Sequence, residues 1–247
     1  MSGRAILKRL LPSQLRAALT TARAAHGSGM LIFWMSSRGN ARQVLRLGSA
    51  YGGWVVPADR FNERSVCYCA GCGEDITFDL ALIAQFGCPV YGIDPTPRAI
   101  DFVQAETADE PRYRLLPIGL WSANETVRFY APQDDKHVSH SITNMQLTEK
   151  YFEAEVRTLA AVMAEHGHTE LSLLKLDIEG AELEVLESVL DDSIDIDVLC
   201  VEFDCLTDRS PAMRTRLRAL LERLRRAGYQ LFWLEGRNFT FTKVRPA

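Results

Sequence analysis

The segment Leu173-Leu174-Lys175-Leu176-Asp177-Ile178-Glu179-Gly180-Ala181-Glu182 decides the fold of this chain, because an alternation of apolar and charged residues breaks at Gly180 into a helical pattern. This break predicts a β-strand that is followed directly by a helix. It also puts Asp177 and Glu179 at the carboxyl end of the strand. Ligands of open parallel α/β sheets bind in the crevice outside these ends, so we expect both carboxylates in a functional site.

Strands, turns and helices alternate on both sides of this segment. Before it, the pattern predicts a strand at residues 65–70, a glycine turn at 71–73, a helix at 75–86, a strand at 89–93 and a helix at 97–107 with Thr96 as its N-cap. From the segment onwards, it predicts a strand at 171–178, a helix at 181–190, a strand at 197–203, a helix at 214–227 and a hairpin at 229–234 and 239–244. The sequence therefore predicts an α/β fold with a mostly parallel, doubly wound sheet and a C-terminal antiparallel hairpin.

The middle of the chain is less regular. Residues 113–118 and 126–130 are predicted as strands, the second of them in a short hairpin, and residues 158–165 as a helix that Thr158 caps. Residues 134–146 are polar and irregular. A loop of this length inside a compact domain is either functional or disordered.

Composition bounds the class of protein. The chain has 247 residues, of which 47% are hydrophobic and 24% charged, which suits a single globular α/β domain. No apolar run approaches the roughly 20 residues that span a bilayer, and no signal-peptide pattern is present. The six cysteines lie in strand patterns or are scattered, which favours buried, reduced thiols over disulfides. We therefore expect a cytoplasmic protein.

Residues 1–50 are predicted as a basic helical arm that precedes a domain at 51–247. Residues 1–58 contain eight Arg or Lys and no acid, whereas the remainder carries 20 bases and 32 acids. The arm is either a solvated helix packed on the domain or a surface helix that contacts an anionic membrane or a phosphorylated substrate. An organelle transit peptide is a third interpretation.

The glycine turn points to a nucleoside ligand. Gly71 and Gly73 follow the first strand, and Asp94 ends the second strand, 23 residues after Gly71, where an acid can accept hydrogen bonds from ribose hydroxyls. A dinucleotide site would have a third glycine at position 76, which is Ile76 here, and the acids at 74 and 75 would repel a diphosphate.

S-adenosylmethionine is a nucleoside cofactor without phosphates, and its sulfonium cation tolerates nearby carboxylates. Its ribose would meet Asp94, and its adenine would lie beside Pro95, Thr96, Gly119 and Leu120. An NAD-dependent oxidoreductase is the disfavoured alternative.

Three blocks of the chain resemble the signature of FkbM-type methyltransferases. They are residues 69–79 (CAGCGEDITFD), 86–97 (FGCPVYGIDPTP) and 174–182 (LKLDIEGAE), and residues 51–54 and 137–141 match further pieces. The resemblance covers about residues 50 to 245 and is most specific in the third block. It implies a Rossmann-like class I methyltransferase fold that binds S-adenosylmethionine and typically O-methylates a hydroxyl of a sugar, glycolipid or polyketide. It also implies that Gly71, Gly73, Asp94 and Asp177 line the cofactor and that Tyr51, Gly52 and Trp54 cover its methionine end.

Methyl transfer to a hydroxyl needs an acceptor oxygen in line with the C–S bond and a base that takes its proton. The candidates are His140, His137 and Asp177, and we choose His140 with Asp177 as the catalytic pair. Both histidines could equally be solvated loop residues. Lys175 shares a strand face with Asp177 and Glu179, so it is expected to pair with one of them.

Several of these residues allow other interpretations. Carboxylates at 177, 179, 202 and 204 suit magnesium, but Lys175 can offset their charge, so we assign no metal. The cysteines at 67, 69 and 72 lack a second ligand pair for zinc. The arginines of 214–227 are expected on a solvated helix face, not on a nucleic acid. A catalytically silent domain that binds the cofactor as an interaction module is the alternative function, and the acceptor and oligomeric state are not encoded in a readable pattern.

Overall fold

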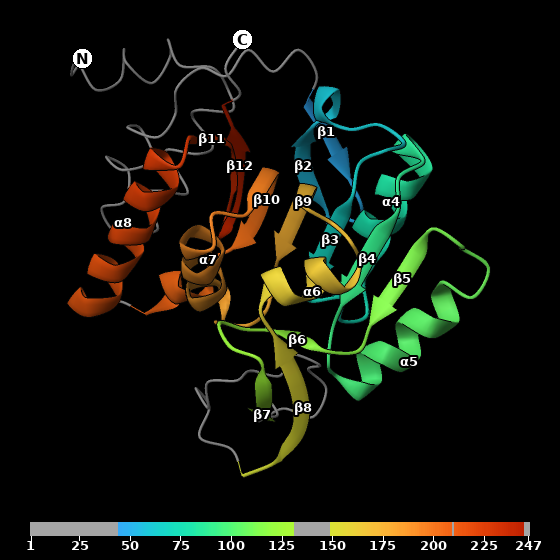
Figure 1. The fold of residues 1–247 in the computed structure, drawn as a ribbon, viewed down its shortest axis with the longest axis horizontal. Coiled ribbons are helices and arrows are strands. Elements are labelled where there is room, and N and C mark those ends of the chain that lie inside the picture. The colour runs from blue at the N-terminus through green and yellow to red at the C-terminus, as the bar shows by residue number, and fades with distance from the viewer. Residues whose placement is uncertain (1–43, 131–148, 209, 245–247) are drawn as a thin grey trace, which may run out of the picture.

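The computed structural model describes residues 44–130, 149–208 and 210–244. A seven-stranded sheet forms its centre, in the order β11-β12-β10-β9-β3-β4-β5 (Figure 1). Its strands are β3 (Cys67–Ala70), β4 (Val90–Ile93), β5 (Tyr113–Leu116), β9 (Glu170–Leu176), β10 (Asp195–Glu202), β11 (Tyr229–Glu235) and β12 (Asn238–Lys243). Strand β12 runs antiparallel to both neighbours, and the remaining pairings in this sheet are parallel. The predicted parallel sheet with a C-terminal hairpin is confirmed, and the strand order is that of the Rossmann-like class I methyltransferase fold.

Helices cover both faces of this sheet, as expected for a doubly wound fold. On one face, α4 (Thr77–Phe86) and α5 (Pro97–Glu106) pack on Cys67, Cys69 and Leu173. On the other face, α6 (Leu159–Glu165), α7 (Glu182–Asp191) and α8 (Pro211–Arg226) pack on Tyr68 and Leu174. Strands buried on both sides are apolar along their length, which is why the sequence located them correctly.

Local capping explains three of the helix boundaries. The hydroxyls of Thr158 and Ser210 accept hydrogen bonds from the amides of Ala161 and Met213 at the starts of α6 and α8. Gly87 ends α4 in a left-handed conformation. Thr96 is the N-cap residue of α5, as predicted, but the expectation that its hydroxyl makes a capping hydrogen bond is wrong. The amide of Thr96 donates to Asp94.

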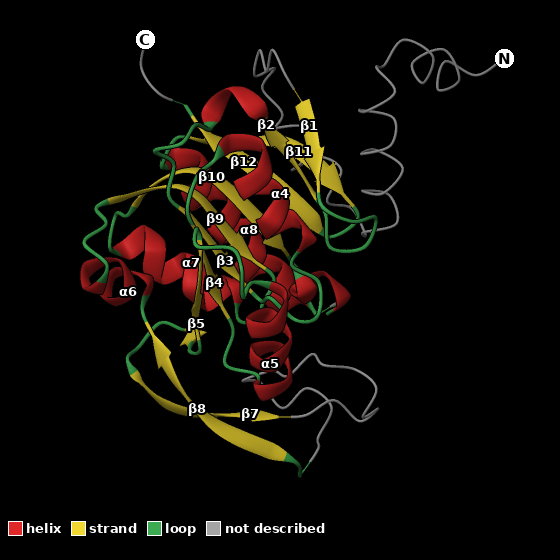
Figure 2. Ribbon diagram, turned by 90° about the vertical axis from the view of Figure 1, so that its right-hand side faces the viewer, coloured by secondary structure: helices red, strands yellow, loops and turns green. Residues whose placement is uncertain are grey.

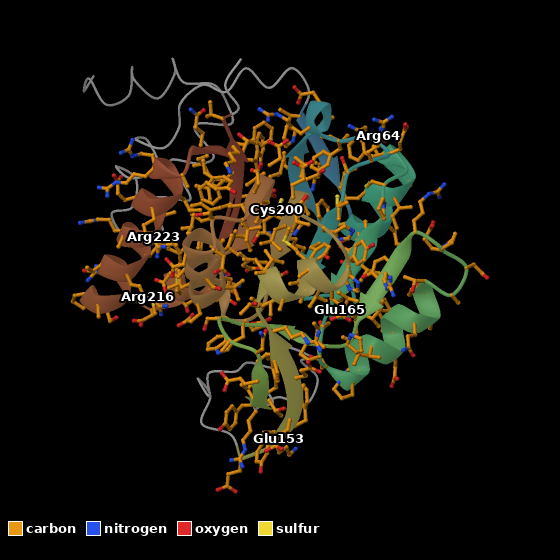
Figure 3. The ribbon with its side chains drawn as sticks, in the orientation of Figure 1. Arg64, Glu153, Glu165, Cys200, Arg216 and Arg223 are labelled. Atoms are coloured by element: carbon orange, nitrogen blue, oxygen red, sulfur yellow. The ribbon has the colours of Figure 1, made fainter. Side chains whose placement is uncertain are left out.

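Two small sheets flank the central one. Strands β1 (Val44–Leu47) and β2 (Trp54–Pro57) form an antiparallel ribbon, and η1 (Ala58–Arg60) follows. Strands β6 (Gly119–Leu120), β7 (Glu125–Tyr130) and β8 (Tyr151–Arg157) form a three-stranded sheet whose β7 and β8 extend from one end of the molecule (Figures 1 and 2). In Figure 3, Cys200 lies in the central sheet, whereas Glu153 lies on this extension.

Strands β1, β2, β6 and β8 were not predicted. Their segments are short or, as in β8, alternate with charged side chains that leave only Val156 buried, so the apolar signal is weak. The predicted arm is described only from Val44 onwards, where it forms β1 rather than a helix. The polar loop at 134–146 lies outside the described residues.

Candidate functional site

A cavity of about 420 Å³ opens at the carboxyl ends of β3, β4, β9 and β10. Its wall is built from the β1–β2 turn, the segments that follow β3, β4 and β9, strand β6, and the β11–β12 turn. All residues predicted to bind the cofactor line it: Tyr51, Gly52, Trp54, Gly71, Gly73, Asp94, Pro95, Thr96, Gly119, Leu120 and Asp177. The fold thus brings together residues that are up to 126 positions apart, from 51 to 177.

Asp94 holds the glycine turn. Its Oδ2 accepts hydrogen bonds from the amides of Cys72 (2.9 Å) and Gly73 (3.0 Å), and its Oδ1 accepts one from Thr96 (2.8 Å). The residue is only 6% exposed. Asp94 therefore ties the loop after β3 to the end of β4, and its Oδ1 has capacity for a further donor from the cavity.

The two glycines of the turn have different roles. A Cβ on Gly71 would lie 1.7 Å from the carbonyl oxygen of Asp177, and its φ of +85° is left-handed. Gly71 is therefore required for the close approach of two chain segments, not for the approach of a ligand. Gly73 has a φ of +53°, and a Cβ there would meet nothing within 4 Å. The absence of a side chain at Gly73 therefore leaves open space at the turn.

The β1–β2 turn is anchored to the start of α4. The hydroxyl of Ser49 donates to Asp75 Oδ2 (2.6 Å) and accepts hydrogen bonds from the amides of Tyr51 and Gly52. Burial acts to raise the pKa of Asp75, but hydrogen bonds from Ser49 and Thr77 outweigh it and lower that pKa. The turn is thus fixed over the cavity, while Tyr51 itself is 90% exposed at its edge.

Lys175 is a buried cation below the cavity and is 4% exposed. Its Nζ donates to the carbonyl oxygen of Gly71 (2.7 Å) and lies 3.5 Å from Asp177 Oδ2, which confirms the expected ion pair. Burial acts to lower the pKa of Lys175, but the charges of Asp177 and Asp79 outweigh it and raise that pKa. Lys175 therefore stays charged.

Asp79 was missed from the sequence. It lies in α4, is fully buried and accepts a hydrogen bond from the hydroxyl of Tyr113 (3.0 Å). Burial raises its pKa against the opposing effect of Lys175. An acid among the apolar residues of a predicted helix was the available signal.

Two pairs of carboxyl groups lie on one part of the cavity wall, Asp177 with Glu202 and Glu179 with Asp204. The members of each pair interact electrostatically. Arg237, from the β11–β12 turn, forms ion pairs with Glu202 and Asp204. Burial, followed by the charge of the paired carboxylate, raises the pKa of Glu202 to about 7 and that of Asp204 to about 6. This wall holds protons that isolated carboxylic acids would release.

Glu182 fixes the loop that presents Glu179. Its Oε1 accepts hydrogen bonds from the amides of Ile178 (3.2 Å) and Gly180 (3.0 Å), which flank Glu179. Glu179 has a φ of +54°, a strained conformation for a residue with a side chain. Oε2 of Glu182 is buried without a hydrogen-bond partner. Burial raises the pKa of Glu182 to about 8 against the opposing effect of these backbone bonds.

Apolar residues form the opposite wall. Phe129 of β7 lines the cavity beside Leu120 and stacks on Phe152 of β8, with ring centroids 5.3 Å apart. A Cβ on Gly119 would lie 2.8 Å from the Phe129 ring. The sequence placed Gly119 and Leu120 at the site but missed Phe129, because the position of β7 depends on pairing with the unpredicted β8.

The remaining candidates have different outcomes. His140 and His137 lie outside the described residues. Within the described ranges, no group of three or more His, Cys, Asp or Glu side chains is arranged to hold a metal ion. The cysteines at 67, 69 and 72 are buried and free. Among the described helices, none combines the length and apolar character needed to cross a membrane.

Comparison with known proteins identifies the family. The model of the Methyltransferase FkbM domain matches residues 62–231. The probable methyltransferase-like protein 24 of Rattus norvegicus is 26% identical over a match that covers 58% of this chain and 35% of that protein. The chain thus spans about a third of the length of this curated relative.

Solved structures show weaker likenesses. Monomeric WbdD is 14% identical with a TM-score of 0.43, over 73% of this chain and 36% of that chain. Aeropyrum pernix fibrillarin in complex with natively bound S-adenosyl-L-methionine is 9% identical with a TM-score of 0.40, over 74% of this chain and 66% of that chain. Such low TM-scores carry no functional argument, and the fold rests on the strand order of the chain itself.

Proposed function

The chain belongs to the FkbM methyltransferase domain family, and we propose that it is an enzyme that uses S-adenosylmethionine to methylate a hydroxyl group of a sugar, glycolipid or polyketide-type acceptor. One observation carries the proposal: a single cavity at the carboxyl edge of the sheet is lined by Asp94, Gly73 and the carboxylate wall around Asp177. Bound S-adenosylmethionine would supply a methyl group that its sulfonium makes electrophilic.

The cavity chemistry fits this cofactor better than a dinucleotide. The amides of Cys72 and Gly73, which a pyrophosphate would need, already donate to Asp94. Glu74 is paired with Arg98 but adds further negative charge near the turn. An anionic cofactor is therefore disfavoured, whereas a cationic one is favoured by Asp177 and its neighbours.

In this proposal each part of the cavity wall has one role in binding or positioning. Asp94 accepts a hydrogen bond from the ribose with the free capacity of Oδ1, and Leu120 and Phe129 pack on the apolar adenine side. The turn with Tyr51 covers the methionine end. The carboxylate wall then orients the acceptor hydroxyl, and positioning supplies most of the rate. The sequence predicts His140 as the base, and His140 lies outside the described residues. A cytoplasmic location and contact of the basic arm with an anionic membrane also stay predictions from the sequence.

A binding measurement tests the cofactor. We expect S-adenosylmethionine and S-adenosylhomocysteine to raise the melting temperature of the full chain, and NAD to have no effect. A ligand at 100 times its dissociation constant contributes about 2.7 kcal/mol. Stabilisation by NAD alone would contradict the proposal.

Turnover separates an enzyme from a silent cofactor-binding domain. The full chain is incubated with S-adenosylmethionine and, one at a time, sugars, glycolipids and polyketides that carry free hydroxyls. We expect S-adenosylhomocysteine to form only when an acceptor is present, and O-methyl product to form in equal amount. Cofactor binding without product across all three classes would favour the silent domain.

A further inference from the structure

Two carboxyl groups face the cavity from adjacent strand ends. Leu176 of β9 is paired with Val201 of β10 in parallel register, so the next residues, Asp177 and Glu202, lie side by side. Both line the cavity. The negative charge of Asp177 acts on Glu202 and favours the protonated form of Glu202.

The surroundings favour the protonated form of Glu202. Lys175, which is buried, lies 3.5 Å from Asp177 and offsets the charge of that residue. Glu202 is paired with Arg237 at 2.7 Å, but the Arg237 side chain is 45% exposed, so water screens its charge. Asp204 adds a further negative charge from η2 (Asp204–Thr207). These surroundings therefore favour the binding of a proton by Glu202.

Glu202 is also placed to exchange that proton with a ligand. Its side chain is 19% exposed, and this exposed part faces the cavity. Arg237 restricts the motion of the carboxyl group by binding Oε1. A group that is fixed, open to the cavity and readily protonated has the properties of a general base.

On the basis of the proposed function, we propose that Glu202, in place of the His140 predicted from the sequence, is the catalytic residue that takes the proton of the acceptor hydroxyl during methyl transfer. The acceptor oxygen forms a bond to the methyl carbon, and the C–S bond breaks with its electron pair passing to sulfur. The O–H bond breaks with its pair staying on oxygen, and the carboxylate of Glu202 binds the released proton. The balance needs no further reactant.

The ionisation of Glu202 agrees with this role. Burial and the neighbouring Asp177 raise its pKa to about 7, so the carboxylate form is available from neutral pH upwards. A base whose pKa lies near the working pH combines availability with proton affinity.

Sinefungin tests the placement without a known acceptor. This analogue carries a protonated amine where S-adenosylmethionine carries its methyl group, whereas S-adenosylhomocysteine carries nothing there. If Glu202 faces that position, its ionisation favours sinefungin alone. We expect the affinity ratio of sinefungin to S-adenosylhomocysteine, measured by calorimetry on the full chain, to rise about tenfold between about pH 6 and about pH 8 as Glu202 loses its proton.

Two variants assign the ionisation. Glu202→Gln has the same shape and is expected to bind S-adenosylhomocysteine normally while its affinity ratio stays flat with pH. Asp204→Asn removes a carboxylate of the other pair, which Arg237 also contacts, and is expected to keep the rise.

A flat ratio in the wild-type protein would overturn the assignment even if no variant folds. A rise that persists in Glu202→Gln, or that disappears in Asp204→Asn, would also overturn it. Failure of the proposed function is distinguishable, because it would appear as no binding of S-adenosylmethionine or S-adenosylhomocysteine at any pH.

Discussion

Replacement of Asp94 should lower the free energy of unfolding even when no cofactor is bound. Its carboxylate accepts three backbone hydrogen bonds, from Cys72, Gly73 and Thr96. A hydrogen bond to a charged group contributes about 1.5 to 3 kcal/mol. At the lower value, three bonds sum to about 4.5 kcal/mol. Water from the adjacent cavity can reach part of this loop, so we expect Asp94→Ala to lower the free energy of unfolding by about 3 kcal/mol.

Asp94→Asn is the matched control. Its single amide oxygen can replace Oδ2 and keep the bonds from Cys72 and Gly73, while its NH₂ group faces the amide of Thr96 and loses that bond. The expected loss is about 1.5 kcal/mol, half that of the alanine variant. Urea unfolding of the free chain, followed by circular dichroism, measures both values.

The same variants separate a role in the loop from a role in binding. If Asp94 also contacts the ribose, both should bind S-adenosylmethionine with about 1 to 3 kcal/mol less free energy. Equal stability of wild type and Asp94→Ala would refute the reasoning about the loop. A stability loss with unchanged affinity would refute the ribose contact alone.

Three further predictions concern the same edge of the sheet. Gly71→Ala should destabilise by about 2 to 5 kcal/mol through clash and left-handed strain, against about 1 kcal/mol for Gly73→Ala, and urea unfolding would contradict this if the two were equal. Lys175→Met leaves two acids without their buried cation, so its free energy of unfolding should fall by about 3 kcal/mol at neutral pH; an unchanged denaturation midpoint would count against the ion pair. Glu182 has a folded-state pKa of about 8 against an ordinary 4.5, so the folded state holds a proton that the unfolded chain releases, and stability should fall as pH rises between these values. Glu182→Gln should remove that fall, and parallel stability curves of the two proteins over this range would show that Glu182 is ionised in the folded state.

The sequence located the central sheet because its strands are buried on both faces. Residues 171–176 and 196–201 are apolar except at Ser172, Lys175 and Asp197, which leaves a long apolar signal. The cofactor-side residues were also found, since glycines and an acid directly after strands have few other uses. These features depend on residues that are close in the sequence, so they can be predicted from a single sequence.

Contacts that depend on the order of the strands in the sheet could not be predicted from the sequence. Arg237 lies in the turn of the predicted C-terminal hairpin, but its neighbours in space depend on β12 entering between β10 and β11. That insertion brings the turn beside Glu202. Periodicity predicts which residues face a core, but it does not state which strand lies next to which.

Three unfavourable features of the described residues gather in one place, and this has a physical explanation. Glu179 has a left-handed backbone, Glu182 has an unpaired buried oxygen, and Glu202 lies close to the negative charge of Asp177. Each of these costs stability, and all three lie at the carboxyl edge of β9 and β10. The interior of the sheet is packed on both faces and can hold that edge in a strained arrangement. A ligand that brings positive charge to the edge reduces the repulsion between the carboxylates. This reduction contributes favourably to the free energy of binding. The same acids would oppose a phosphate, which is why the electrostatics of the edge, more than the shape of the glycine turn, favour a sulfonium cofactor.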